Sequence, residues 1–376
     1  MRIHIIFYLL FITIILSCNS LDETSNLTEE NNDNDLNNNK EECLSCINFE
    51  IITLGVGPEG EIVDEPKVPA ALKISTNDSI YYEGTIGIEI RGESSQYFDK
   101  KSFGFETWDN QYNDIDVSLL GFPEEEDWIL YGPFSDKSLI RNKLIYDLSN
   151  QMGRYASKTE FVELSINYEY KGLYIFMEKL KRDNNKINIQ KLNENDIDET
   201  LITGGYIIKI DKSDMEDGSY TDYNSFQSKY DVFGKKDGDK KVYFNYEYPK
   251  PSEIHAYQKN YIKNYINEFE SSLASDQFKN SENGYRKYID VNSFIDFFIL
   301  NEISNNVDGF RLSTYLHKDR EKKLIIGPIW DFNLSFGNAD YCGGERYDIW
   351  LHKFNERCLG DFWNIPFWWN RFLEDE

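Results

Sequence analysis

Two aspartates near the end of the chain have surroundings that suit carboxylate chemistry. Asp331 follows an apolar run in "LIIGPIWDF", and Asp308 stands 23 residues earlier in "NNVDGF". A carboxylate at the end of a buried strand costs several kcal/mol unless it is neutralised, paired or bound to a cation. Asp308 follows a helical pattern, and an anion gains nothing from the dipole at a helix C-terminus. We therefore expect both carboxylates to have a partner.

The residues between the two aspartates predict a β-hairpin. "RLSTYLH" and "LIIGPIWDF" alternate well enough to be strands, and "KDREKK" is typical of a turn. Such a hairpin returns both carboxylates to the same end. Protein kinases use this order, because Mg²⁺ ions on a nucleotide need oxygen ligands and a carboxylate must orient the attacking hydroxyl. The spacing alone also fits aspartates that only form turns.

The first part of the chain predicts strands. Short alternating runs separated by Gly, Pro, Asn and Asp indicate a meander, and a further hairpin is expected over 161–181 with its turn at 167–171. The polar stretch 181–250 is expected to hold loops and one strand, "GGYIIKID". The meander runs are "FEIITLGV", "AALKIST", "SIYYEGTIGIEIRG" and "KKSFGFETW".

Helical periodicity appears once in this N-terminal part and predominates from residue 253. A helix is expected over 135–152, with Ser135 or Asp136 as its N-cap and Gly153 as its C-cap. Two more are expected over 253–275 and 290–306. The fold class is therefore α+β, with a β-rich N-terminal part and a helical C-terminal part that carries the hairpin.

Composition excludes some partners. The chain has 376 residues, of which 40% are hydrophobic, so it can bury a sizeable core. Its formal net charge of −26 argues against a general basic surface, and we expect no nucleic-acid binding. A polyanionic ligand would need a local basic pocket or a bridging metal ion.

The N-terminus predicts export. Residues 1–17 have the form of a signal peptide, and "ILSC" places a lipidated Cys18 at the start of the mature chain. The acidic, Asn-rich residues 18–46 are expected to be a tether. We expect a lipid-anchored protein on the bacterial cell envelope, outside the cytoplasm. Export permits one or two disulfides among Cys43, Cys46, Cys342 and Cys358, and the sequence leaves open which of them form.

Five segments carry a resemblance to a known family. They are "RGESSQYFDKKSFGFE", "DWILYGPFSDKSLIRNKLIYDLSNQMG", "NYEYKGLYIFMEKL", "LNEISNNVDGFRLSTYLHKD" and "GPIWDFNLSFGNADY". Together they resemble the CotH family of spore-coat-protein-H-like atypical kinases over residues 85–376, which leaves 47–84 as a separate β-strand region. The resemblance implies a divergent protein-kinase-like fold that transfers a phosphoryl group from ATP, with Mg²⁺ or Mn²⁺, to Ser residues of a protein substrate.

The resemblance also implies roles for individual residues. Asp331 matches the family's metal-binding aspartate and Asp308 its catalytic aspartate. Glu178 is similar to the acid that pairs with a nucleotide-binding lysine, and that lysine would be Lys100 or Lys101. Strand alternation puts only one of these two lysines in the cleft.

Further residues complete this expected site or depart from the kinase pattern. Arg91 is a second candidate for binding phosphates, beside a turn over 92–95 whose amides would meet the triphosphate. A kinase has Asn where this chain has Ser313, a weaker metal ligand. Asn333 is expected to be a metal ligand, and Asn305 and Asn306 are the other candidates for the missing amide.

Each assignment has an alternative. Glu178 would form a surface ion pair with Lys179 or Lys181, Lys100 and Lys101 would be a solvated strand edge, and Asp136 with Arg141 would be a helix cap. For the whole chain, the alternative is a catalytically inactive envelope lipoprotein that binds a surface protein or glycan, because ATP is scarce outside the cytoplasm. The apolar ending "NIPFWWNRFLEDE" predicts that the domain is truncated.

Overall fold

The computed structural model describes residues 46–55, 60–215 and 217–375. The chain divides into the units Met1–Cys43 and Leu44–Glu376, and only the second contains described residues. The expected signal peptide, Cys18 as the expected lipidation site, and Cys43 lie outside the described residues. Among the residues that are described, no helix is both long and apolar enough to cross a membrane.

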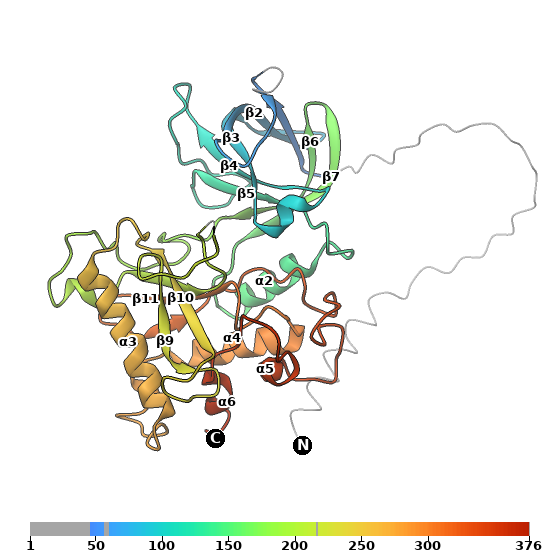
Figure 1. Ribbon diagram of the computed structural model, residues 1–376. Helices are drawn as coiled ribbons and strands as arrows, with labels where there is room; N and C mark the ends of the chain where they lie inside the picture. Colours follow the sequence, from blue (N-terminus) through green and yellow to red (C-terminus); the bar gives the residue numbers. More distant parts are fainter. Residues whose placement is uncertain (1–45, 56–59, 216, 376) are drawn as a thin grey trace, which may run out of the picture. The chain divides into compact units, whose positions relative to one another are not determined.

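Seven strands form a closed barrel in the order β1-β2-β3-β4-β5-β7-β6, with β1 and β6 pairing in parallel to close it (Figure 1). The expected meander is confirmed in β1 to β4. β3 runs across position 84, so the region 47–84 and the residues that follow build one barrel. The strands are β1 (Asn48–Thr53), β2 (Val68–Ser75), β3 (Ile80–Arg91), β4 (Ser102–Trp108), β5 (Asp127–Tyr131), β6 (Thr159–Ile166) and β7 (Glu169–Glu178).

The hairpin between β6 and β7 has the predicted turn. Asn167 and Tyr168 have positive φ angles of 51° and 68°. Two left-handed residues in succession match the right-handed twist of the flanking strands, which is why such turns join antiparallel strands. The two strands pair antiparallel, as the alternation in this segment predicted.

A second sheet has the order β12-β11-β8-β10-β9. The expected hairpin forms, with β11 antiparallel to β12. The prediction of one strand in 181–250 was wrong, because three lie there. β9 is mostly polar and alternates poorly, and its place depends on pairing with β10. The strands are β8 (Tyr206–Ile210), β9 (Ser225–Asp231), β10 (Lys241–Tyr248), β11 (Thr314–Lys318) and β12 (Leu324–Ile326).

The helices agree with the sequence except at one end. The helix predicted from 135 begins at Arg141, because Leu139 has a φ of 64° and cannot continue a right-handed helix. Gly153, with a φ of 78°, follows its end as predicted. The α-helices are α2 (Arg141–Gln151), α3 (Ala256–Ala274), α4 (Val291–Ser304), α5 (Phe354–Arg357) and α6 (Trp368–Phe372), and the 3₁₀ helices are η2 (Ser94–Tyr97), η3 (Leu201–Thr203), η4 (Tyr285–Lys287) and η5 (Leu351–Lys353).

Two large apolar cores and one small cluster, of Ile187, Ile189 and Ile207, support these elements. One large core fills the barrel, and the other lies among the second sheet and the helices. Ile129, Ile175 and Met177 of the barrel belong to the second core, so the two halves are packed against each other. α2 lies between the barrel and α4 (Figure 1). The α+β class is confirmed, and α2 is placed where it can contact both halves.

A disulfide is present among the described residues. Cys342 and Cys358 are bonded, with their Cα atoms 5.7 Å apart. Cys46 is also disulfide-bonded. The sequence left the disulfide state of the four cysteines open, and the structure supplies the pairing of Cys342 with Cys358.

Candidate active site

Three aspartates from separate segments come together where strands and a helix end. Asp211 follows β8, Asp308 follows α4, and Asp331 follows β12. Burial raises the pKa of Asp331 to about 7, with further increases from the charges of Asp308 and Asp211 and a partial offset from Arg91 and Lys212. The structure thus brings the two predicted aspartates into one electrostatic cluster and adds a third acid.

Asp331 is held by its backbone and leaves its carboxylate free. Its N–H donates to the Tyr146 hydroxyl at 3.0 Å, and the next N–H, of Phe332, donates to Asn142 Oδ1 at 2.7 Å. Its φ of 61° is a left-handed conformation that costs about 1–3 kcal/mol for a non-glycine residue. No described residue donates a hydrogen bond to the Asp331 carboxylate or forms an ion pair with it. These contacts orient the side chain without using up its oxygens.

Asp308 is held through one carboxylate oxygen. Its Oδ1 accepts hydrogen bonds from Arg311 Nη2 and from the Tyr341 hydroxyl, each at 2.8 Å. Arg311 is itself fixed, because its Nη1 also lies 3.3 Å from Asp361 Oδ1. Among the described residues nothing is bonded to Asp308 Oδ2. A carboxylate oriented in this way can accept a proton through its second oxygen.

Arg91 is the basic residue associated with Asp331. It ends β3, and its guanidinium carbon lies 6.0 Å from the centre of the Trp330 ring. Burial lowers the pKa of Arg91, while the nearby Tyr315 and Asp331 act to raise it. No acceptor among the described residues is bonded to its guanidinium. The sequence named Arg91 as a phosphate-binding candidate, and its position fits that role.

The structure does not bring Glu178 together with Lys100 or Lys101. Lys100 Nζ donates to the Lys171 carbonyl at 3.0 Å and lies 4.2 Å from the centre of the Tyr174 ring. Lys101 Nζ donates to the carbonyl of Gln96 at 2.6 Å. Each lysine therefore donates to a backbone carbonyl, that of Lys171 in β7 for Lys100 and that of Gln96 in the 3₁₀ helix Ser94–Tyr97 for Lys101.

Glu178 is enclosed at the end of β7. It is 0% exposed, and its Oε2 accepts hydrogen bonds from the Tyr155 hydroxyl at 3.2 Å and from the Lys158 N–H at 2.9 Å. Burial raises its pKa. The alternative of a surface ion pair with Lys179 or Lys181 does not form either. Glu178 has a structural environment away from the basic residues expected to pair with it.

The candidate amide ligands differ in how they are used. Asn333 Nδ2 lies 3.4 Å from Ser135 Oγ, which leaves its Oδ1 without a partner among the described residues. Asn305 donates to three carbonyl oxygens of the segment 343–346. Asn306 Nδ2 donates to Asn301 Oδ1 at 3.3 Å. Asn305 and Asn306 hold local structure through their amide nitrogens. The Oδ1 atom of Asn306, which is buried, and that of Asn333 both lack a partner among the described residues, so each keeps an oxygen for a ligand.

The turn predicted to meet phosphates lies at the end of β3. Gly92 has a φ of 104°, and a Cβ there would come within 2.0 Å of Ser95 Oγ, so the turn requires glycine. Glu93 reaches Lys212 at 3.4 Å, which connects the turn to the residue after Asp211. The turn and the acids thus belong to one region.

Asp211 is the site residue that the sequence interpretation missed. A signal was present, because "YIIKID" is an apolar strand that ends on an aspartate, as "GPIWD" does. The stretch was interpreted as an isolated strand among loops. Its position at the centre of the second sheet, beside β11, is what brings Asp211 to the hairpin.

A separate acidic group on the barrel does not belong to this region. Asp116, Glu125 and Glu126 offer oxygens that all lie within 4.8 Å of one another. Two lysines already neutralise it, since Lys181 and Lys186 both pair with Glu125. Among the described residues, the three site aspartates do not form such a compact group. A cation bound there would therefore be coordinated by a bound ligand as well as by these carboxylates.

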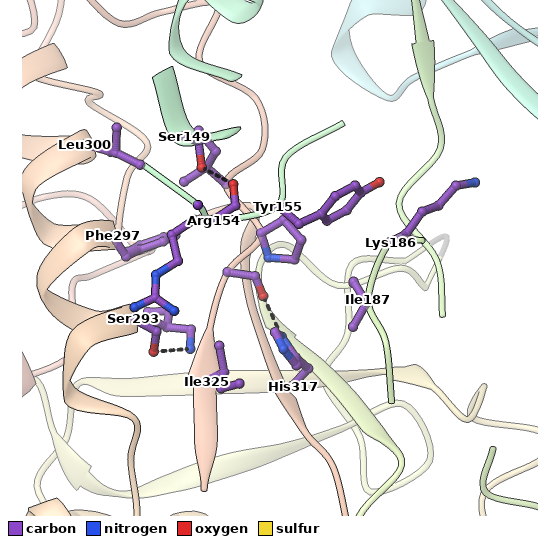
Figure 2. Close-up of a pocket in the computed structure, with 15 residues that line it drawn as sticks. Ser149, Arg154, Tyr155, Lys186, Ile187, Ser293, Phe297, Leu300, His317 and Ile325 are labelled. Carbon is purple, nitrogen blue, oxygen red and sulfur yellow. Dashed lines mark hydrogen bonds between the residues drawn. The ribbon is translucent and has the colours of Figure 1, made fainter. Parts of the chain in front are cut away.

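A cavity of ≈170 Å³ is lined in part by residues 325–329, the segment that leads to Asp331 (Figure 2). His317 Nδ1 contacts the carbonyl of Gly327 at 3.0 Å, and burial lowers the pKa of this histidine. Ser149 donates to the Arg154 carbonyl at 3.0 Å. These polar groups bond to neighbours in its wall, and none points to a ligand.

Comparisons with known proteins agree on one family. The family described as CotH kinase protein matches residues 88–376. Inner spore coat protein H of Bacillus subtilis (strain 168) is 22% identical over 286 residues, which cover 76% of this chain and 66% of that protein. The chain therefore spans just under two thirds of this relative's length. The predicted resemblance is confirmed, and the chain belongs to the CotH family.

Proposed function

We propose that this protein is an atypical protein kinase that transfers a phosphoryl group from ATP to Ser residues of a protein, with Mg²⁺ or Mn²⁺. The chain would use a divergent kinase-like arrangement, with the barrel as one half of the cleft and the second sheet with its helices as the other. The family described as CotH kinase protein supports this proposal, as does the order aspartate, hairpin, aspartate.

The single observation that carries the proposal is the free carboxylate of Asp331. Its neighbours Asp308 and Asp211 raise its pKa, after the larger effect of burial, and no described cation pairs with it. A divalent cation fits this donor set, because it would relieve the repulsion and because carboxylate oxygens are its preferred ligands. Asp331 and Asn333 would hold it. When bound, it would neutralise phosphate charge and orient the transferred group.

The other residues would bind and orient the reactants. Arg91 and the backbone of the turn 92–95 would hold phosphate oxygens, which the guanidinium suits because it has no acceptor among the described residues. Asp308 would accept the proton of the serine hydroxyl at Oδ2 while Arg311 and Tyr341 hold Oδ1. Arg91 would therefore provide the positive charge that the sequence expected from Lys100 or Lys101.

A second candidate function rests on the missing ion pair. Glu178 contacts Tyr155 and Lys158 rather than a nucleotide-binding lysine. A protein without this pair would bind a surface protein or glycan without transferring phosphate. In either case we propose an envelope protein outside the cytoplasm, anchored through a lipid on Cys18.

Thermal unfolding with ATP and Mn²⁺ tests the proposal. At 100 times its dissociation constant, a ligand that binds only the folded state adds about 2.7 kcal/mol to the unfolding free energy. The wild type should show this gain only when nucleotide and metal are both present. Asp331→Ala should abolish it, whereas Asp276→Ala, at an exposed aspartate just after α3, should keep it. An unchanged wild type would reject the kinase proposal and favour the binding function.

Transfer itself requires a second measurement. Incubation with labelled ATP and serine-containing protein extracts of the cell envelope should give labelled phosphoserine with wild type and none with Asp331→Ala. Nucleotide binding without any transfer would support the inactive alternative.

A further inference from the structure

We infer that Asp211 is an acidic ligand of the metal–nucleotide site, in the place where a kinase uses an asparagine. The inference rests on the proposed function and adds a residue that neither the family resemblance nor the comparisons assign. It also accounts for the weak ligand at position 313. A kinase site holds two metal ions. Beside the ion held by Asp331 and Asn333, a second ion would take its ligand, Asp211, from the end of the neighbouring strand of the sheet.

The strand register places Asp211 beside Ser313. Thr314 in β11 pairs with Ile210 in β8, so the residue before one strand lies next to the residue after the other. The Lys212 N–H donates to Asp211 Oδ1 at 2.9 Å, and the Ser313 N–H acts to lower the pKa of the Asp211 carboxyl. Ser313 has a φ of 45°, a left-handed conformation. The backbone at position 313 therefore faces a carboxylate that position 211 provides.

The surroundings of Asp211 do not neutralise it fully. Lys209 Nζ lies 4.0 Å from Asp211, but it also pairs with Asp214 at 3.0 Å and with Glu247 at 3.4 Å. One lysine thus serves three carboxylates. Asp211 therefore shares its lysine with two other carboxylates and is the most distant of the three from Lys209 Nζ.

Two further side chains point to a ligand between these elements. The half-buried Asp331 carboxylate has no donor and the half-buried Arg91 guanidinium has no acceptor among the described residues. An unpaired acid and an unpaired base in one region fit a ligand that carries cations and phosphates together. Mg²⁺ and Mn²⁺ on a nucleotide meet that description, and they take one or two carboxylates plus phosphate oxygens and water.

Mn²⁺ binding in the presence of a non-hydrolysable ATP analogue tests the inference. Electron paramagnetic resonance would count bound ions, and calorimetry would give their affinity. We expect two Mn²⁺ per wild-type protein, and for Asp211→Ala either one ion or at least about tenfold weaker binding of one of them. Asp211→Asn keeps an acceptor for the neighbouring N–H groups, and its Mn²⁺ affinity should lie between those of wild type and Asp211→Ala.

Asp214→Ala is the matched control. Asp214 stands three residues on, contacts the same Lys209, and is not inferred to be a ligand. It should change Mn²⁺ affinity by less than about threefold, and circular dichroism should show all variants folded.

The possible failures are distinguishable. If Asp211→Ala and Asp211→Asn match Asp214→Ala in number and affinity of ions, Asp211 is not a ligand, while wild-type binding still supports the proposed function. If the wild type binds no Mn²⁺ with the nucleotide analogue, the proposed function and this inference both fail.

Discussion

The Asp331 N–H donates to the Tyr146 hydroxyl at 3.0 Å, which connects α2 directly to the residue that we propose binds metal. Asn142, one helical turn earlier, accepts from the next N–H. Arg141 extends the contact, because its Nε donates to the Ser335 carbonyl at 2.9 Å. α2 therefore holds the segment after β12 at successive turns, and a shift of α2 would move the Asp331 carboxylate.

The variant Tyr146→Phe should weaken metal-dependent nucleotide binding. It removes one hydrogen bond, worth about 0.5–1.5 kcal/mol, and thus about 2- to 10-fold in affinity. Calorimetry with Mn²⁺ and an ATP analogue would measure the change. Tyr265→Phe is the control, since it also loses one bond, from its hydroxyl to the Tyr288 carbonyl at 2.7 Å. Equal affinities in the two variants would show that Tyr146 does not position Asp331.

The variant Asp308→Asn should separate binding from transfer. An amide oxygen still accepts from Arg311 and Tyr341, so nucleotide affinity should stay within about threefold of wild type. The amide cannot take a proton, and general-base catalysis contributes about 10²–10⁴-fold, so the transfer rate should fall by that factor. Single-turnover phosphorylation with labelled ATP would measure it. A rate within tenfold of wild type would exclude Asp308 as the base.

Local patterns predicted much of the fold, and non-local pairing accounts for most of what they missed. The alternation in β1 to β4 and the turn at Asn167 are set by neighbours in sequence, so they were confirmed. The parallel pairing of β1 with β6 joins Asn48 to Glu163, and no local pattern encodes it. The helix start at Arg141 was missed because Leu139 adopts a left-handed conformation that Asp136 and its bonds support.

The candidate site shows the same division. Asp308 and Asp331 flank a hairpin that the sequence reveals, so their common position was predictable. Asp211 reaches them only through the order of strands in the second sheet. Arg91 lies by Asp331 while Lys100 is turned to a backbone carbonyl, and this choice among basic residues depends on tertiary packing.

Glu270 should make stability depend on pH. It is 0% exposed in α3, and its carboxylate accepts from Ser228 Oγ and from Trp368 Nε1 at 3.0 Å. Burial raises its pKa from 4.5 to about 7, despite the opposing effect of these hydrogen bonds. The folded state therefore holds more protons between these two values, and the unfolding free energy should fall as pH rises through that window.

The variant Glu270→Gln tests this effect. The unfolding free energy of Glu270→Gln minus that of wild type should increase by about 3 kcal/mol from pH 4 to pH 8, because the shift of the wild-type pKa is worth that much. Urea unfolding at several pH values would measure the difference, in which contributions from other groups cancel. Glu268→Gln, at an exposed position of the same helix, should track wild type. If the difference in unfolding free energy between Glu270→Gln and wild type does not change with pH, the pKa of Glu270 is not raised in the folded wild type.

The disulfide between Cys342 and Cys358 should stabilise the segment that supports Asp308. Tyr341, which donates to Asp308, precedes the first cysteine, and Asn305 bonds to carbonyl oxygens inside the closed loop. The bond closes a loop over a sequence separation of 16, for which the chain-entropy model gives about 3 kcal/mol. Replacing both cysteines by serine should lower the unfolding free energy by about that amount.

Reduction supplies the control for this last prediction. A reducing agent also acts on the disulfide of Cys46, so wild type and the double variant should both respond, and wild type by about 3 kcal/mol more. In the double variant the loss of Mn²⁺ binding free energy should be smaller than the loss of unfolding free energy, because Asp331 and Asp211 lie on other segments. Equal responses of the two proteins to reduction would mean that the Cys342–Cys358 bond contributes nothing to folding, and that packing alone holds Tyr341 against Asp308.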